Sequence, residues 1–102
     1  MIYALAYTHV RINSYNILEV IRVSVKDMVA LRLAELCRER GITFNTLATL
    51  SGVTPSTVYS IMDETRRDIS LVTVKKLCDG LEITLGNFFS TPAFDALEQE
   101  IC

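Results

Sequence analysis

Apolar and polar residues alternate with a helical period in two short neighbouring segments, TFNTLATLS and TPSTVYSIM. The apolar positions that recur at helical spacing are Leu47, Ala48 and Leu50 in the first segment and Val58, Ile61 and Met62 in the second. Between the segments lies Gly52, which suits the left-handed conformation that closes a helix because it lacks a Cβ atom. Thr54 then fits an N-cap and Pro55 a first helical position. The pattern predicts two short helices joined by a tight turn.

The second of these helices has an unusual outward side. It carries small or flat polar groups instead of the Glu and Lys of a merely solvated face, namely Ser56, Thr57, Tyr59 and Ser60. A short turn followed by a helix with such a face is typical of the helix-turn-helix motif, whose second helix contacts DNA. The alternative interpretation is a purely structural pair of helices.

Four further helices are predicted from the same period. The first lies at residues 26–40 and is closed by Gly41, and the second lies at residues 71–81. The third is a short helix that begins after its N-cap, Thr84, and the fourth lies at residues 93–101. Thr43 is the expected N-cap of the first helix of the pair, and residues 63–70 form a polar loop. The apolar residues expected on the inward faces are Val29, Leu33, Leu36, Cys37, Val74, Leu77, Cys78, Leu81, Leu85, Phe88, Phe89, Phe94, Leu97 and Ile101. The predicted fold class is all-α, a compact five-helix domain with a short extra helix at its C-terminal end.

Residues 1–22 differ in composition from the rest, because they are rich in Tyr, Ile and Val and show neither helix caps nor a clean period. They are too short and too polar for a membrane span and lack the features of a secretory signal. One interpretation is an arm or β-strand that pairs with its copy in a dimer. The other is a misplaced start, in which the codons of residues 18–21 form a ribosome-binding stretch and translation begins at Val23 or Val25. His9 has no cluster of cysteines or carboxylates near it in the sequence, so no catalytic or metal role is expected for it.

The length and composition of the chain indicate its number of domains, its cellular compartment and the distribution of its charge. A chain of 102 residues, half of them apolar, accommodates one domain with a modest core. Cys37, Cys78 and Cys102 show no CxxC spacing, which favours reduced thiols in a cytoplasmic protein, the first two in the core, over disulfides or zinc. The formal net charge is −2, but residues 23–78 hold eight Lys/Arg against six Asp/Glu, whereas residues 79–102 hold five acidic residues and no basic ones. A mildly basic middle and an acidic tail predict weak non-specific affinity for nucleic acid.

Over about two-thirds of its length, residues 25–90, the chain resembles the Cro/C1-type helix-turn-helix proteins, also called the XRE family, which have the lambda repressor-like fold. The resemblance is carried by four segments in the family's order and at its intervals: LAELCRERGIT, LATLSGV, STVYSIM and TVKKLCDGLEITLGNFF. It implies a small five-helix transcription regulator that often binds DNA as a dimer. We therefore expect an N-terminal arm at residues 1–24, a DNA-binding domain at 25–90 and a short C-terminal helix or tail at 91–102.

The resemblance also implies roles for individual residues. The helix at 55–62 corresponds to the recognition helix in the major groove, and its residues at base-facing positions are Pro55, Ser56, Tyr59 and Ser60. The residues at phosphate-facing positions are Thr43, Thr57, Arg66 and Arg67. For the two arginines, a solvated charge pair is the alternative interpretation.

Three departures from the family pattern matter for function. Many relatives carry glutamine where this chain has Phe44, so a polar contact is expected to be absent. Many also bury an Arg–Glu ion pair at the positions of Cys37 and Met62, and its joint replacement by apolar groups is compatible with an intact fold. Pro55 and Ser56 offer no Arg, Asn or Gln for a bidentate base contact, which leaves Tyr59, thymine methyl groups and DNA shape as sources of specificity.

The function predicted from the sequence is a sequence-specific regulator of transcription, most simply a repressor that binds double-stranded operator DNA as a homodimer. The alternative is a protein-interaction module of the same fold, such as an antitoxin-like protein, that holds a partner through the Tyr59 face or the acidic tail. An enzyme is not expected, because the sequence shows no nucleophile–base set, no glycine-rich phosphate loop and no cluster of metal ligands. We accordingly expect no cofactor, no small-molecule substrate and no association with a membrane.

Overall fold

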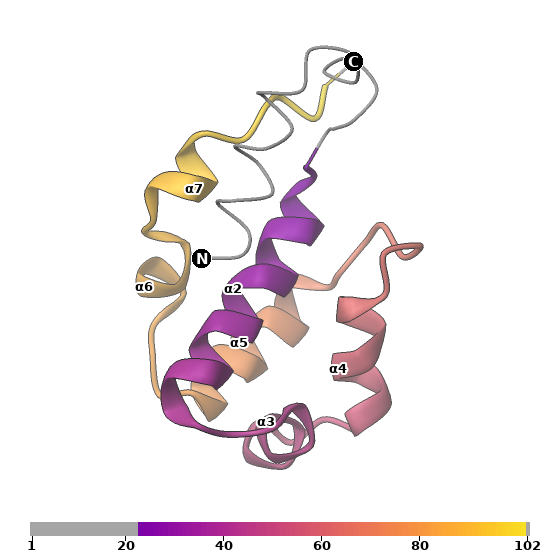
Figure 1. The fold of residues 1–102 in the computed structure, drawn as a ribbon, viewed down its shortest axis with the longest axis vertical. Helices are drawn as coiled ribbons and strands as arrows, with labels where there is room; N and C mark the ends of the chain where they lie inside the picture. The colour runs from indigo at the N-terminus through magenta and orange to yellow at the C-terminus, as the bar shows by residue number, and fades with distance from the viewer. Residues whose placement is uncertain (1–22, 102) are drawn as a thin grey trace.

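The structure, a computed structural model, describes residues 23–101. Both interpretations of residues 1–22 concern a segment that lies outside the described residues. The described part of the chain contains helices and no strands, which confirms the all-α class (Figure 1). The helices are α2 (Val25–Arg40), α3 (Phe44–Ser51), α4 (Pro55–Met62), α5 (Leu71–Gly80), α6 (Leu85–Phe89) and α7 (Pro92–Asp95). Within residues 23–101, no helix is both long enough and apolar enough to cross a bilayer.

Local capping signals set most of the helix boundaries. Thr43 caps α3 by accepting a hydrogen bond from the Thr46 N–H, and Thr84 caps α6 in the same way through Asn87. Ser24 and Asp27 form a reciprocal capping box, so α2 begins at Val25, one residue before the predicted start. At the other end of α2, Gly41 adopts the left-handed conformation with φ 65°.

A single core joins five of the helices. Its buried residues come from α2, α3, α4, from α5 with its C-cap, and from α6, and they include the following side chains: Val29, Leu33, Leu36, Cys37, Leu47, Ala48, Val58, Ile61, Val74, Leu77, Cys78, Leu81 and Phe88. Phe89 of α6 and Phe94 of α7 pack edge to face with their ring centroids 4.9 Å apart, and both rings lie near that of Phe88. The aromatic cluster expected from the sequence is present and ties α7 to the domain.

One expectation about the C-terminal segment was wrong. The predicted helix at 93–101 ends after one turn, at Asp95, and Ile101 is exposed instead of facing inward. No glycine is present to close a longer helix here. The negative charges of Glu98 and Glu100 would also lie near the negative C-terminal end of such a helix, which is unfavourable. Leu50 shares the spacing of Leu47 but is 56% exposed, because it lies beside the narrow buried stripe of α3.

The helices α3 and α5 approach each other closely where Gly80 meets Ser51. A Cβ atom on Gly80 would lie 2.1 Å from the Ser51 Oγ and 3.0 Å from the Ser51 Cα and N atoms. The absence of a side chain at position 80 therefore permits the contact that sets α3, and through α3 the turn and α4, on the rest of the domain.

Candidate nucleic-acid interface

The turn between α3 and α4 has the geometry that the sequence predicts. Gly52 adopts φ 70°, and the N–H of Val53 donates to the Ala48 carbonyl at 3.1 Å, which closes α3. Thr54 then takes an extended conformation and caps α4, whose first residue is Pro55. Because Ala48 and Val58 are fully buried, the two helices are held as one unit with the core behind them.

The outward side of α4 carries all four residues predicted to face bases. Pro55, Ser56 and Tyr59 are exposed, and Ser60 is half-buried. Tyr59 is 52% exposed and is the largest side chain that α4 presents to solvent. The inward side of the same helix is closed by Val58 and Ile61. The structure thus groups the predicted base-facing residues on one surface; their contact with bases stays a prediction.

Hydroxyl groups at the start of α4 bond to one another. The Thr54 Oγ1 accepts from the Thr57 N–H at 3.3 Å and lies 3.0 Å from both the Ser56 Oγ and the Thr57 Oγ1. Thr57, predicted to face phosphate, is therefore half-buried within this network instead of projecting freely. Thr43, the other predicted phosphate-facing threonine, is exposed at the start of α3 and bonds to Thr46. Together the two helix starts present caps and N–H groups of the kind that suit an anion.

An aromatic contact joins the first residue of α3 to the outward side of α4. The ring of Phe44, the first residue of α3, lies edge to face with the ring of Tyr59, with centroids 5.9 Å apart and planes at 85°. The sequence interpretation of Phe44 considered only the polar contact that it removes. The structure shows what replaces that contact, since Phe44 is half-buried against the core and fixes one side of Tyr59. The pairing could not be found from spacing, because the residues belong to different helices.

The loop after α4 holds the two arginines predicted to face phosphate. Asp63 organises its first turn: its carboxylate accepts from the N–H of Thr65 at 2.9 Å and from the Thr65 hydroxyl at 2.7 Å. The bonds from Thr65, the hydroxyl first, lower the pKa of the Asp63 carboxyl, and the charges of Arg66 and Lys26 add to this effect. Arg66 and Arg67 are both exposed, and the Nε of Arg66 lies 3.8 Å from the Asp63 carboxylate.

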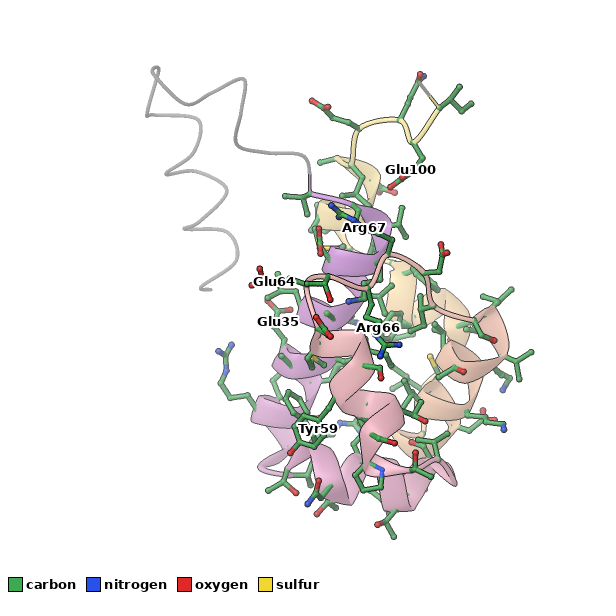
Figure 2. All side chains as sticks on the ribbon, turned by 90° about the vertical axis from the view of Figure 1, so that its right-hand side faces the viewer. Glu35, Tyr59, Glu64, Arg66, Arg67 and Glu100 are labelled. Carbon is green, nitrogen blue, oxygen red and sulfur yellow. The ribbon has the colours of Figure 1, made fainter. Side chains whose placement is uncertain are left out.

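Figure 2 relates these arginines to the recognition face. Arg66 lies beside the C-terminal end of α4, Arg67 lies above it, and Tyr59 projects from the lower half of the same helix. Glu35 and Glu64 lie between Tyr59 and Arg67 in height. The basic groups are thus interspersed with acidic ones, which agrees with weak non-specific attraction to a polyanion.

Lys26 is a positioning residue that sequence reasoning missed. It is 4% exposed, and its Nζ donates to the carbonyl of Asp63 at 2.6 Å. This bond fastens the end of α4, and therefore the arginine loop, to the first turn of α2. A signal was available in the sequence, since Lys26 precedes Val29, Leu33 and Cys37 at intervals that place it on the buried stripe of α2.

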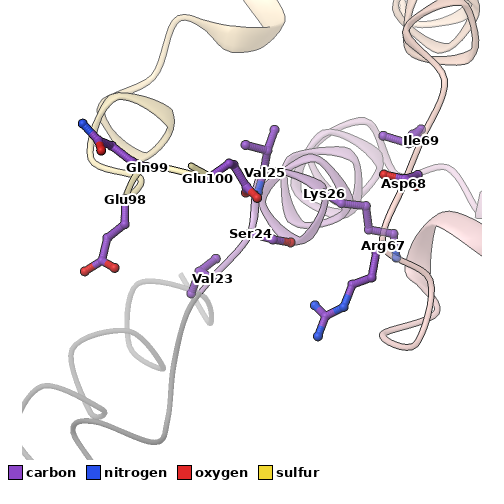
Figure 3. A pocket seen from close by; sticks show the side chains of 10 residues that line it. All are labelled: Val23, Ser24, Val25, Lys26, Arg67, Asp68, Ile69, Glu98, Gln99 and Glu100. Atoms are coloured by element: carbon purple, nitrogen blue, oxygen red, sulfur yellow. The ribbon is translucent and has the colours of Figure 1, made fainter. Parts of the chain in front are cut away.

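The acidic tail lies across the N-terminal end of α2. The N–H of Val25 donates to the Glu100 carboxylate at 3.1 Å, an arrangement that the positive end of the helix favours. Figure 3 shows the groove that results, about 570 Å³ in volume, with Glu100 beside Val25 on one side and Arg67 beside Lys26 on the other. Glu100 of the tail and Arg67 of the loop therefore line the same groove.

The described residues offer little chemistry of other kinds. Cys37 and Cys78 are free and buried, and burial raises the pKa of both thiols. A raised pKa keeps a thiol neutral and unreactive, in agreement with core roles. Within residues 23–101, no three His, Cys, Asp or Glu side chains gather as metal ligands would.

These features define a small helical domain built around a helix-turn-helix. The family model for the Cro/C1-type helix-turn-helix DNA-binding domain matches residues 32–93. The chain belongs to this family. Among solved structures it is similar to prophage Lp1 protein 11, with 27% identity and a TM-score of 0.67 over 76% of this chain and 100% of that chain. No curated protein matches the chain.

Proposed function

We propose that this protein is a sequence-specific regulator of transcription that places α4 in the major groove of its operator. The family supports DNA binding as the general activity. The observation that carries the specific proposal is the outward face of α4, where Pro55, Ser56 and Tyr59 are exposed on a helix whose other side is anchored in the core. Thr43, Thr57, Arg66 and Arg67 flank this face and serve as the phosphate contacts that fix its register.

The simplest action of such a protein is repression in the cytoplasm, by occupation of a promoter. In this proposal residues 25–90 form the DNA-binding unit, residues 1–24 an arm and residues 91–102 a tail that packs on the unit through Phe94. Two copies bind a two-fold symmetric operator, because one eight-residue recognition helix covers only one half-site. The protein acts without a cofactor and is not an enzyme.

Fluorescence anisotropy of the purified protein on its own upstream intergenic DNA tests the proposal. We expect saturable binding that survives a scrambled competitor and weakens steeply as salt rises. A folded protein that binds this DNA no better than the competitor, or not at all at low salt, would contradict it. Footprinting of the bound fragment then gives the half-site spacing, and with it the number of copies bound.

A second candidate function is supported by one feature of the same surface. The exposed ring of Tyr59, packed against the half-buried Phe44 on a helix without Arg, Lys, Asn or Gln, also resembles the centre of a protein-interaction surface. In that case the protein holds a partner protein, as an antitoxin does. Binding of a partner that is insensitive to salt and is lost in Tyr59→Ala would favour this candidate over the first.

A further inference from the structure

The arrangement of Phe44 and Tyr59 indicates which chemical group the recognition helix reads. We infer that the ring of Tyr59, held in place by Phe44, contacts the C5-methyl group of a thymine in the major groove. This inference rests on the proposed function, since it assumes that α4 binds DNA. It names the ligand group and assigns Phe44 as a positioning residue.

The first step concerns what α4 cannot offer. Bidentate recognition of guanine or adenine requires Arg, Lys, Asn or Gln, and α4 contains none of these from Pro55 to Met62. Its short hydroxyl side chains near the start are bonded to each other through the Thr54 Oγ1, with oxygen–oxygen distances of 3.0 Å. Donor and acceptor patterns of the bases are therefore poorly matched by this helix.

The second step concerns what α4 does offer. Tyr59 presents about half of its surface to solvent, so an aromatic ring is the dominant exposed group of the recognition face. The apolar group that unmodified DNA exposes in the major groove is the thymine methyl. An aromatic ring that approaches a base edge therefore finds its complement at thymine and lacks it at cytosine.

The third step concerns orientation. A tyrosine on a helix surface has rotamer freedom that binding must remove, at a cost in affinity. Phe44 lies edge to face with Tyr59 at 5.9 Å and is itself held against the core. This contact favours one orientation of the Tyr59 ring before DNA binds, which lowers the cost of ordering it. Phe44 acts through Tyr59 and does not itself have to touch a base.

The test begins with a selection that requires no knowledge of the operator. A duplex library with a randomised centre is bound to the full chain, and the enriched sequence is resynthesised with deoxyuridine in place of each thymidine in turn. This replacement removes the methyl group and leaves the hydrogen-bonding groups unchanged. We expect one or two positions per half-site where affinity falls by about fourfold, the factor that corresponds to one buried methyl group. 5-Bromodeoxyuridine, whose bromine fills the place of the methyl, should restore affinity there.

Variants then assign the effect to residues. Tyr59→Ala should bind the thymidine and deoxyuridine duplexes equally, and Tyr59→Phe should retain the full ratio because the ring remains. Phe44→Ala should lower the ratio, with Phe44→Leu, which keeps most of the packing volume, as the variant that separates loss of the aromatic contact from loss of folding. Leu71→Ala, which alters an exposed apolar side chain on α5, is the matched control and should leave the ratio unchanged. Far-ultraviolet circular dichroism checks that each variant is folded.

The outcomes separate the two levels of the proposal. An enriched sequence whose binding does not depend on any thymine methyl would overturn the inference and leave the regulator intact. Methyl dependence that persists in Tyr59→Ala would also overturn it, because another residue would then carry the contact. If no sequence is enriched, the proposed function itself fails, and the inference fails with it.

Discussion

The inward and outward faces of the α3–α4 pair differ in their surroundings, since the first is buried in the core and the second faces solvent. Leu47 and Val58 are 0% exposed and belong to the hydrophobic core of the domain. Tyr59, one position after Val58, is 52% exposed, and its ring lies edge to face with that of Phe44. We therefore expect the inward face to determine stability and the outward face to determine which ligand is bound. Substitutions on the two faces should affect different measurements, and the following predictions test that separation in order of decreasing effect.

The largest effect is expected from Leu47→Ala. The substitution leaves a cavity in the core, and the free energy of unfolding should fall by about 2–5 kcal/mol. Leu50→Ala is the matched control, since it removes the same atoms from the same helix at a position that is 56% exposed. It should cost less than about 0.5 kcal/mol. Urea denaturation measures both, and similar losses for the two variants would contradict the assigned faces.

The next effect tests the support of the pair by α5. Gly80→Ala should destabilise the protein by about 1–3 kcal/mol, because the added methyl group would overlap Ser51 and push α3 from α5. Gly86→Ala serves as the control, since a Cβ there meets only the Thr84 Oγ1 at 3.9 Å. It should leave stability unchanged or raise it, because alanine favours helix more than glycine does. A stabilised Gly80→Ala variant would show that the close approach is absent in solution.

A smaller effect is expected from the arginine loop. The double substitution Arg66→Ala and Arg67→Ala should weaken DNA binding and reduce the slope of log K against log salt by about 2, or about one per lost phosphate contact. Lys75→Ala and Lys76→Ala remove the same charge from an exposed part of α5 and provide the comparison. Equal changes in slope for the two pairs would mean that the arginines act only through net charge.

The smallest effect concerns pH and the buried cysteines. Burial raises the pKa of Cys37 and Cys78 above the ordinary thiol value of 9.0. The neutral thiols contribute stability that is fully present below the unfolded-state pKa and is lost as pH rises through the folded-state pKa, because only the unfolded chain ionises easily in between. The urea midpoint should therefore decline above about pH 9. The decline should be shallower in Cys37→Ala/Cys78→Ala, and an identical decline would assign it to other groups.

Local signals made much of the fold predictable from the sequence. Thr43 and Thr54 cap the helices that directly follow them, and Pro55 occupies the first position of α4. Gly41 and Gly52 adopt the left-handed conformation that closes the helices directly before them. These features depend on residues a few positions apart, so a pattern in the sequence contains them. The α2, α3, α4 and α5 boundaries accordingly agree with the prediction to within one residue.

What the sequence could not provide are the contacts between distant segments. The Lys26–Asp63 bond, the approach of Gly80 to Ser51 and the Phe44–Tyr59 pair each join different helices or a helix and a loop. The predicted helix at 93–101 was wrong for a related reason, since its apolar spacing is helical but the segment lacks a cap and Glu100 bonds to Val25 instead. The positions of the candidate site residues on α4 follow from local structure, whereas the edge-to-face contact of Tyr59 with Phe44 does not.

The central claim is that the outward face of α4, with the start of α3 and the arginine loop, is the surface that binds DNA. A titration of the isotope-labelled protein with its own upstream intergenic duplex, followed by backbone amide shifts in NMR, tests it most directly. We expect the largest shifts at residues 43–46, 54–60 and 64–67, with α6 and α7 little changed. Shifts that centre on α6, α7 or the acidic tail, or no shifts at all in the folded protein, would contradict the claim.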